Sequence, residues 1–341
     1  MNEQAVVKKM SPKDFETDQE VRWCPGCGDY AILKGVQMAL ANTGATPENT
    51  VFVSGIGCSS RFPYYISTYG FHTIHGRAPA FATGVKITNP DLDVWLVTGD
   101  GDGLSIGGNH MLHVLRRNVD MQIMLFNNEI YGLTKGQYSP TSKPGLKTPS
   151  TPMGSVDRPL SPCAFALGAG ARFIARGIDT SLKELPVTLA RAKDHKGASF
   201  VEIFQNCIVY NDKVFDEFTT KKTAKDTQLH VKNGERMIFG KEANKGLRLN
   251  AKNLTLEVVT IGENGITEDD ILIHDETNRT MALLLIDLAA PEFPVVCGVI
   301  YCDPAESYDH AVHRQLDAAK KPGKKADFNA LLRKGRTWIV E

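Results

Sequence analysis

Short, almost uninterrupted apolar runs alternate with helix-like stretches through the first two thirds of the chain. The runs lie at residues 51–55 (VFVSG), 94–98 (VWLVT), 121–126 (MQIMLF), 173–175 (FIA) and 199–204 (SFVEIF). Strands that are apolar on both faces are typical of a parallel sheet with helices on its two sides. The alternation therefore predicts an α/β fold, a doubly wound and mostly parallel sheet with right-handed crossovers.

Helix starts are recognisable between these runs. Asp29 can cap a helix whose apolar residues recur at helical spacing up to Leu40. Ser105 opens a second apolar helical stretch, and Ser181 with Glu184 forms a possible capping box for a third. These signals place one helix after each of several strands.

The alternation fades after about residue 210, which predicts two domains in a chain of 341 residues. Residues 1–210 form the α/β domain, and residues 211–341 a smaller, partly irregular extension that packs on the core and on a partner. Within that extension we expect a polar segment at 213–250, a strand at 256–261, a helix at 280–288 and a strand at 298–301.

Residues 138–160 are rich in Pro, Gly, Ser and Thr and predict a long loop. Loops of this length inside a compact domain are often lids or contact surfaces. We therefore expect this loop to take part in function.

The charge balance excludes several classes of protein. The 39 basic and 39 acidic residues cancel, which disfavours a polybasic nucleic-acid binder. The most apolar stretch, 281–301, is interrupted by charged and proline residues, so we expect no membrane span. The first ten residues lack the apolar segment of a secretory signal, so we expect a cytoplasmic protein in which cysteines stay reduced.

A glycine-rich turn follows the second apolar strand. Asp100 lies within Gly-Asp-Gly-Asp-Gly at the end of this strand, and Asn128 and Ile130 follow the next strand. Ligands of open α/β sheets bind at the carboxyl ends of the strands, where glycines and a helix start can receive phosphate. Carboxylate and amide oxygens suit Mg²⁺. The pair of motifs predicts a magnesium-diphosphate site, and a tight turn without function is the alternative.

Four of the seven cysteines fall at the same predicted sheet edge. Cys24 and Cys27 form a Cys-x-x-Cys motif, and Cys58 and Cys207 each follow a strand. Four thiolates suit an iron–sulfur cluster or zinc equally well by ligand type. The other three cysteines are interpreted as small buried apolar residues: Cys163, Cys297 and Cys302.

With both motifs in place, the chain resembles the β subunits of the 2-oxoacid:ferredoxin oxidoreductases. The matching stretches are CPGCGDY (24–30), GIGCSSRFPYY (55–65), HTIHGRAPAFATGVK (72–86), TGDGDGLSIGGNH (98–110), NNEIYGLTKGQYSPTS (127–142) and FQNC (204–207). The chain size and the residues around His274 resemble the two-subunit, 2-oxoglutarate-type enzymes.

The resemblance implies a set of ligands. One [4Fe–4S] cluster is bound by Cys24, Cys27, Cys58 and Cys207, and Mg²⁺ by Asp100, Asn128 and the Ile130 carbonyl. Thiamine diphosphate is surrounded by Ile56, Gly57, Cys58, Ser59, His75, Gly76, Arg77, Ala78, Gly101, Asp102, Gly132, Leu133 and Thr134. His75 is also a candidate catalytic residue, facing the diphosphate or the reacting carbon.

The resemblance also implies the reaction: oxidative decarboxylation of 2-oxoglutarate to succinyl-CoA and CO₂, with single electrons passing through the cluster to ferredoxin. Arg61 is the candidate partner of the distal substrate carboxylate, and Lys135 of the other carboxylate or a phosphate. The alternatives are pyruvate or another 2-oxoacid as substrate, a non-redox thiamine enzyme with structural zinc, and a non-catalytic metal-stabilised module.

This sequence contains no motif for the carboxylate that forms the thiamine ylide. In the resembled family that carboxylate belongs to an α subunit, which also supplies most of the coenzyme A site. We therefore expect an αβ pair, doubled to (αβ)₂, that is inactive as a single chain.

Overall fold

The computed structural model describes residues 10–320 and 327–340 of the chain. The prediction that the first ten residues are not a secretory signal concerns a segment that lies almost entirely outside the described residues. No helix within the described ranges is both long and apolar enough to cross a membrane.

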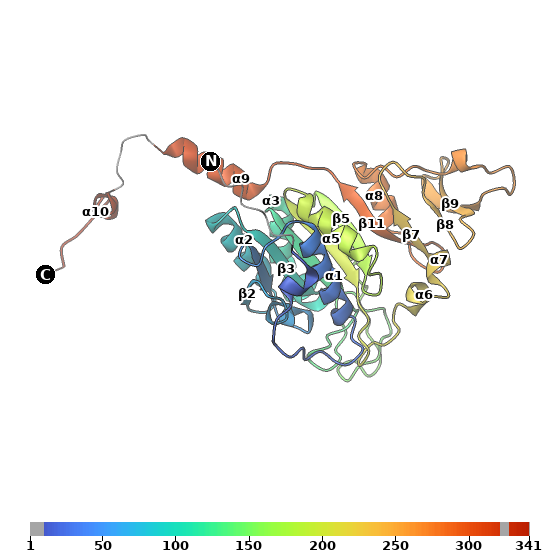
Figure 1. Ribbon diagram of the computed structural model, residues 1–341, viewed down its shortest axis with the longest axis horizontal. Helices are drawn as coiled ribbons and strands as arrows, with labels where there is room; N and C mark the ends of the chain where they lie inside the picture. The colour runs from blue at the N-terminus through green and yellow to red at the C-terminus, as the bar shows by residue number, and fades with distance from the viewer. Residues whose placement is uncertain (1–9, 321–326, 341) are drawn as a thin grey trace.

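An eight-stranded sheet forms the centre of the molecule (Figure 1). Its strand order is β2-β1-β3-β4-β6-β5-β11-β7. The first six strands in this order run parallel, while β11 is antiparallel to β5 and parallel to β7. The strands are β1 (Thr50–Ser54), β2 (Tyr69–His72), β3 (Asp93–Gly99), β4 (Met121–Asn127), β5 (Phe173–Ile178), β6 (Ala198–Phe204), β7 (Gln228–Val231) and β11 (Val295–Cys302). The mostly parallel sheet that the apolar runs predict is confirmed.

Helices cover both faces of this sheet, because alternate residues of the central strands point to opposite sides. On one side, Phe52 and Trp95 pack with helices α1 (Asp29–Asn42) and α5 (Leu185–Asp194). On the other, Val53 and Leu96 pack in a core built with α2 (Ala78–Thr88), α3 (Gly108–Arg117), α4 (Pro162–Gly168) and α8 (Arg279–Ile286). The fold is therefore doubly wound, as predicted.

The rest of the chain after residue 210 forms smaller elements. Strands β8 (Ile238–Phe239), β9 (Lys245–Asn250) and β10 (Thr255–Thr260) make a separate antiparallel sheet. Two short helices precede it, α6 (Asp216–Thr219) and α7 (Ala224–Thr227). Helix α9 (Tyr308–Ala319) contacts α2, where His313 Nε2 lies 2.8 Å from the Ile87 carbonyl, and the short α10 (Phe328–Leu332) lies away from the body (Figure 1).

The structure adds strands that the sequence analysis did not predict. β7 lies in the polar segment 213–250, and β7 and β11 both join the main sheet although they follow residue 210. The main sheet thus contains strands from before and after residue 210. The division of the chain into two domains at residue 210 stays a prediction.

Three predicted helix starts were wrong in detail. Helix α1 has Gly28 as its N-cap residue, so Asp29 is its first helical residue and does not cap it. Helix α5 has Glu184 as its N-cap residue and no side-chain cap, so Ser181 and Glu184 do not form a capping box. The Ser181 carbonyl instead accepts hydrogen bonds from the backbone N–H groups of Glu184 and Leu185. The stretch predicted to open at Ser105 begins earlier, with a π-helical turn over Asp102–Ile106.

Candidate active site

The carboxyl ends of β1, β3 and β4 surround a small cavity of about 50 Å³. Most of the residues predicted to hold the cofactor line this cavity. They are Ile56, Gly57, Cys58, Ser59, His75, Asp100, Gly101, Asp102, Asn128, Ile130, Gly132, Leu133 and Thr134. Parallel strands bring their carboxyl ends to one edge, which is why residues more than seventy positions apart meet here.

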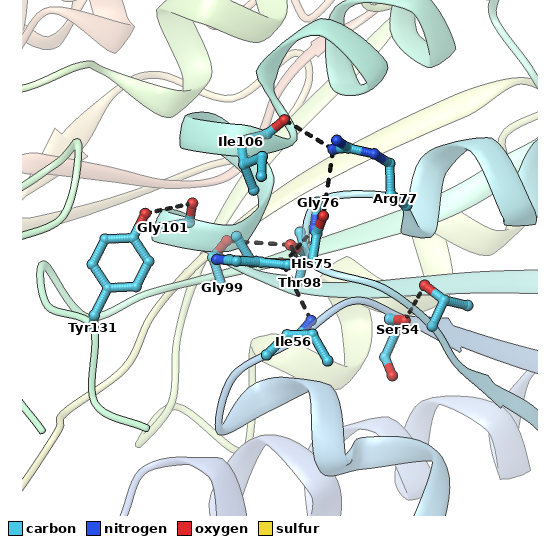
Figure 2. Close-up of polar contacts among 12 residues, drawn as sticks. Ser54, Ile56, His75, Gly76, Arg77, Thr98, Gly99, Gly101, Ile106 and Tyr131 are labelled. Carbon is cyan, nitrogen blue, oxygen red and sulfur yellow. Dashed lines mark hydrogen bonds and ion pairs between the residues drawn. The ribbon is translucent and has the colours of Figure 1, made fainter. Parts of the chain in front are cut away.

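The carboxylate of Asp102 joins three loops at the base of the cavity. Its Oδ1 accepts hydrogen bonds from the backbone N–H groups of Ile56 (3.1 Å) and Gly76 (2.7 Å) and contacts His75 Nδ1. Its Oδ2 accepts one from the Thr98 hydroxyl (2.7 Å). Figure 2 shows these four partners converging on one point. Asp102 is therefore a buried structural junction that holds His75 by one ring nitrogen and leaves the other for the cavity.

Close backbone packing fixes the turn that carries His75. Gly76 has φ +67°, and a Cβ there would lie 2.5 Å from the Gly107 nitrogen. Only glycine allows this approach of the loop to the start of α3. Across the cavity, the Tyr131 hydroxyl donates to the Gly101 carbonyl (3.0 Å), and its ring lies edge-on to the His75 ring (Figure 2).

Asp100, the predicted magnesium ligand that follows β3, is almost fully buried. Its Oδ2 accepts hydrogen bonds from the hydroxyls of Ser139 (2.6 Å) and Thr141 (2.5 Å). Burial raises the pKa of Asp100 to about 6, while these hydrogen bonds act in the opposite direction. A buried carboxylate of this kind is stabilised as an anion by a bound cation.

Asn128 follows the end of β4 and lines the same cavity as Asp100. Its Nδ2 donates to Gln205 Oε1 (2.8 Å), and its Oδ1 accepts from the Ile130 N–H (3.2 Å). The amide is thereby oriented, with its oxygen beside the Ile130 backbone. The three predicted magnesium ligands are thus brought together on one cavity.

A second cavity of about 350 Å³ adjoins the first. All four cysteines predicted as cluster ligands line it: Cys24, Cys27, Cys58 and Cys207. All seven cysteines are free thiols. The two cavities share the lining residues Cys58, Asn128, Gly132 and Leu133. The four predicted cluster ligands and the three predicted magnesium ligands therefore line two adjoining cavities.

Hydrogen bonds tie the cysteine loops to the strand ends. Trp23 Nε1 donates to the Cys58 carbonyl (2.7 Å), which joins the segment before α1 to the loop after β1. Gln205 Nε2 donates to Cys27 Sγ (3.2 Å). A Cβ on Gly132 would lie 3.5 Å from the sulfurs of both Cys58 and Cys207. These two sulfurs are therefore separated by no more than twice that distance.

Burial raises the pKa of the thiols of Cys27, Cys58 and Cys207, to about 12 for Cys58. Thiols this resistant to ionisation become thiolates only beside strong positive charge, as a metal centre supplies. Within the described residues, no three or more His, Cys, Asp or Glu side chains are gathered to hold a single ion. One zinc ion would require sulfurs about 4 Å apart around it.

Several predicted residues lie elsewhere. Arg61 and Lys135 line the cysteine cavity and not the smaller one. Arg61 Nε donates to the Tyr65 hydroxyl (2.7 Å), and its guanidinium stacks on Tyr64 and Tyr65. Gly76, Arg77 and Ala78 are not among the lining residues of either cavity. Arg77 donates to the Ile106 carbonyl instead (Figure 2).

The sequence analysis missed residues that complete the site. Ser139 and Thr141 fall in the predicted long loop and in the matched stretch 127–142 but were given no role, although both contact Asp100. Gln205, between a strand and Cys207, links the two cavities. The only available signal was proximity in sequence to motif residues, which does not fix where a side chain points.

Comparison with known proteins agrees with this geometry. Residues 55–203 match the family of thiamine pyrophosphate enzymes, C-terminal TPP-binding domain. The chain is 48% identical to the 2-oxoglutarate oxidoreductase subunit KorB of Mycobacterium tuberculosis, over 96% of this chain and 88% of that protein. The chain belongs to the 2-oxoacid:ferredoxin oxidoreductase β subunits.

Further members of this family show the same relationship. A 2-oxoacid:ferredoxin oxidoreductase β subunit of Aeropyrum pernix is 45% identical, over 60% of this chain and 64% of its own length. A similar solved structure is the 2-oxoglutarate:ferredoxin oxidoreductase from Magnetococcus marinus with 2-oxoglutarate, coenzyme A and succinyl-CoA bound, whose sequence is 33% identical to this chain. The superposition covers 98% of this chain and 98% of that chain, with a TM-score of 0.76. The predicted family and fold are thereby confirmed.

Proposed function

We propose that this β subunit takes part in the coenzyme A-dependent oxidative decarboxylation of 2-oxoglutarate with ferredoxin as electron acceptor. The observation that carries the proposal is the adjacency of the two cavities, which share Cys58, Asn128, Gly132 and Leu133. A one-electron acceptor must lie close to the carbon that is oxidised, and this arrangement meets that need.

The smaller cavity fits the magnesium-diphosphate end of thiamine diphosphate. Asp100, Asn128 and the Ile130 carbonyl would hold Mg²⁺ with hard oxygen donors, and the cation would offset the burial that raises the pKa of Asp100. The backbone around Gly101 and Gly132 would receive the phosphates, next to the start of a helical turn.

The larger cavity fits an iron–sulfur cluster held by Cys24, Cys27, Cys58 and Cys207. Four free thiols line it, and they are not gathered around one point as a single zinc ion would require. Gln205 donates a hydrogen bond to Cys27 Sγ, a type of contact that tunes cluster potentials. A [4Fe–4S] cluster is the form that the family resemblance favours.

When bound, thiamine diphosphate supplies the electron sink for loss of CO₂, and the cluster accepts the two electrons one at a time. The balanced reaction converts 2-oxoglutarate, coenzyme A and two oxidised ferredoxins to succinyl-CoA, CO₂, one proton and two reduced ferredoxins; in principle it is reversible. His75, held by Asp102 at one ring nitrogen, presents the other to the reacting groups. Tyr131 closes the side of the cavity across from His75.

The substrate assignment to 2-oxoglutarate is supported by relatives. The Mycobacterium tuberculosis and Magnetococcus marinus proteins are both named for 2-oxoglutarate. We assign the distal carboxylate to Arg61, whose guanidinium is held on Tyr64 and Tyr65 beside the cysteine cavity. Lys135, exposed at the same rim, is a weaker candidate for a charged substrate group.

A partner subunit completes the enzyme in this proposal. The described residues that line the smaller cavity include no carboxylate besides Asp100 and Asp102, and both are engaged from within the chain. We therefore assign the activating carboxylate and most of the coenzyme A site to an α subunit, in an (αβ)₂ assembly. The free thiols suit the reducing cytoplasm.

The experiment is anaerobic purification of the chain with its α subunit, followed by iron, sulfide and thiamine diphosphate analysis and a panel of 2-oxoacids. The proposal expects about four irons and four sulfides per chain, with the highest kcat/KM for 2-oxoglutarate. Stoichiometric zinc without iron, or full activity of the single chain, would overturn it. A preference for pyruvate would overturn the substrate alone.

A further inference from the structure

We propose that Arg176 and Glu202, a buried ion pair outside both cavities, are positioning residues for the magnesium ligand Asp100. They act through Asn127 and Thr141. This inference rests on the proposed function, because it assigns the pair a role in holding Mg²⁺.

The first link joins Asp100 to Thr141. The Thr141 hydroxyl lies 2.5 Å from Asp100 Oδ2 and 3.0 Å from Asn127 Oδ1. A hydroxyl carries one hydrogen, so Thr141 donates to only one of these two oxygens at a time. The position of the Asn127 amide therefore decides how firmly Thr141 holds Oδ2 of Asp100.

The second link fixes the Asn127 amide. Its Nδ2 donates to Glu202 Oε1 (2.8 Å), so the amide oxygen must face Thr141. A carboxylate accepts and never donates when ionised, so the reversed amide would set two acceptors against each other. Glu202 thereby allows one orientation of Asn127.

The third link is the ion pair itself. Arg176 Nε donates to Glu202 Oε2 (2.8 Å), and the two residues face each other across the parallel strands β5 and β6. Arg176 and Glu202 are 6% and 1% exposed. Burying two charges costs more than an apolar pair of the same size, so the pair is poorly explained as a stabilising contact.

All four residues of this relay are buried; Thr141 lies in the loop after β4, and Asn127, Glu202 and Arg176 lie on the neighbouring strands β4, β6 and β5. The ion pair keeps Glu202 charged, and Glu202 fixes the Asn127 amide with its oxygen toward Thr141. The Thr141 hydrogen is then shared between Asn127 Oδ1 and Asp100 Oδ2, which leaves Oδ2 freer to bind the cation. Loss of the charge on Glu202 frees the Asn127 amide to turn its Nδ2 toward Thr141, so that Thr141 donates to Asp100 Oδ2 alone and competes with the cation.

The test uses the complex of this chain with its α subunit. Two variants are compared with the wild type: Glu202→Gln, and the double variant Arg176→Gln with Glu202→Gln, which leaves no unpaired buried charge. The matched control is Arg248→Gln with Glu257→Gln, which neutralises another cross-strand arginine–glutamate pair, on β9 and β10. Two dissociation constants are measured: that of Mg²⁺ at saturating thiamine diphosphate, and that of thiamine diphosphate at saturating Mg²⁺. The melting temperature is the third readout.

We expect the Mg²⁺ dissociation constant to rise about tenfold in both Glu202 variants, a change of about 1.4 kcal/mol. The dissociation constant of thiamine diphosphate at saturating Mg²⁺ should change less than about twofold. The control variant should match the wild type in both dissociation constants. A folded double variant with unchanged Mg²⁺ affinity would overturn the inference, as would an equal loss in the control. If the wild-type complex binds neither Mg²⁺ nor thiamine diphosphate, the proposed function fails and the inference fails with it.

Discussion

Gln205 Oε1 accepts a hydrogen bond from Asn128 Nδ2 at 2.8 Å, and the same amide donates to Cys27 Sγ at 3.2 Å. One buried side chain therefore contacts a proposed magnesium ligand on one side and a proposed cluster ligand on the other. Gln205 therefore connects the two ligand sets through a single side chain.

Replacing Gln205 by Leu should lower the reduction potential of the cluster. The Cys27 sulfur loses a donor that stabilises the reduced, more negative state. A hydrogen bond worth about 1 kcal/mol corresponds to roughly 40 mV for one electron. Redox titration followed by EPR measures this shift. The exposed Gln19→Leu variant is the control, and an unchanged potential in Gln205→Leu would contradict the assignment of Cys27 as a ligand.

Removal of single cysteines should separate ligands from core residues. Cys58→Ala should abolish bound iron and the brown colour, because Cys58 lines both cavities. Cys297→Ala, in a buried strand away from them, should keep the iron content of the wild type. Iron and sulfide analysis of anaerobic samples decides between these outcomes. Retention of a full cluster in Cys58→Ala would exclude it as a ligand.

Arg61→Ala should reduce kcat/KM for 2-oxoglutarate far more than for pyruvate, which has no distal carboxylate. Loss of a bidentate charged contact costs about 1.5–3 kcal/mol, or roughly 10- to 100-fold. Arg61→Lys should recover only part of this loss, because an ammonium group does not match the carboxylate bidentately. Equal losses for the two substrates would remove Arg61 from substrate selection.

Asp29 should make the cluster-free protein less stable as the pH rises. Its carboxylate is 1% exposed and lies beside the Cys27 thiol. Burial raises the pKa of Asp29 to about 7 from the ordinary value of 3.8. The folded state therefore holds the proton more tightly than the unfolded state, and stability falls as the pH rises through this window.

Asp29→Asn should flatten this fall, by at most about 1.4 kcal/mol per pH unit. Denaturant unfolding of the cluster-free chain between pH 4 and pH 8 measures the slope. Asp91→Asn, at an exposed position, is the control and should leave the slope unchanged. A slope in Asp29→Asn as steep as in the wild type would show that Asp29 does not cause it.

The fold was predictable where apolar patterning is strong. The runs at 94–98 and 121–126 became β3 and β4, since both of their faces are buried. The edge strand β2 has four exposed residues and so carries no apolar run. β7 has only four residues within a polar segment, and its pairing with β11 depends on contacts far apart in sequence.

The site was predictable to the level of motifs. Asp100, Asn128 and the four cysteines follow strand ends, and strand ends of a parallel sheet converge. The direction of a side chain is set by three-dimensional neighbours, so the roles of Asp102 as a loop junction and of Thr141 as an Asp100 donor were not accessible. For the same reason Arg61, three residues after Cys58, was not predicted to stack on Tyr64 and Tyr65.

The central claim is tested most directly by adding 2-oxoglutarate and coenzyme A to the anaerobic αβ complex and recording its visible and EPR spectra. If electrons pass from the cofactor in the smaller cavity to the cluster in the larger one, we expect bleaching of the iron–sulfur absorption and a reduced-cluster EPR signal. Neither should appear when 2-oxoglutarate is omitted. A complex that carries its cluster and thiamine diphosphate but stays oxidised with substrate present would contradict the account.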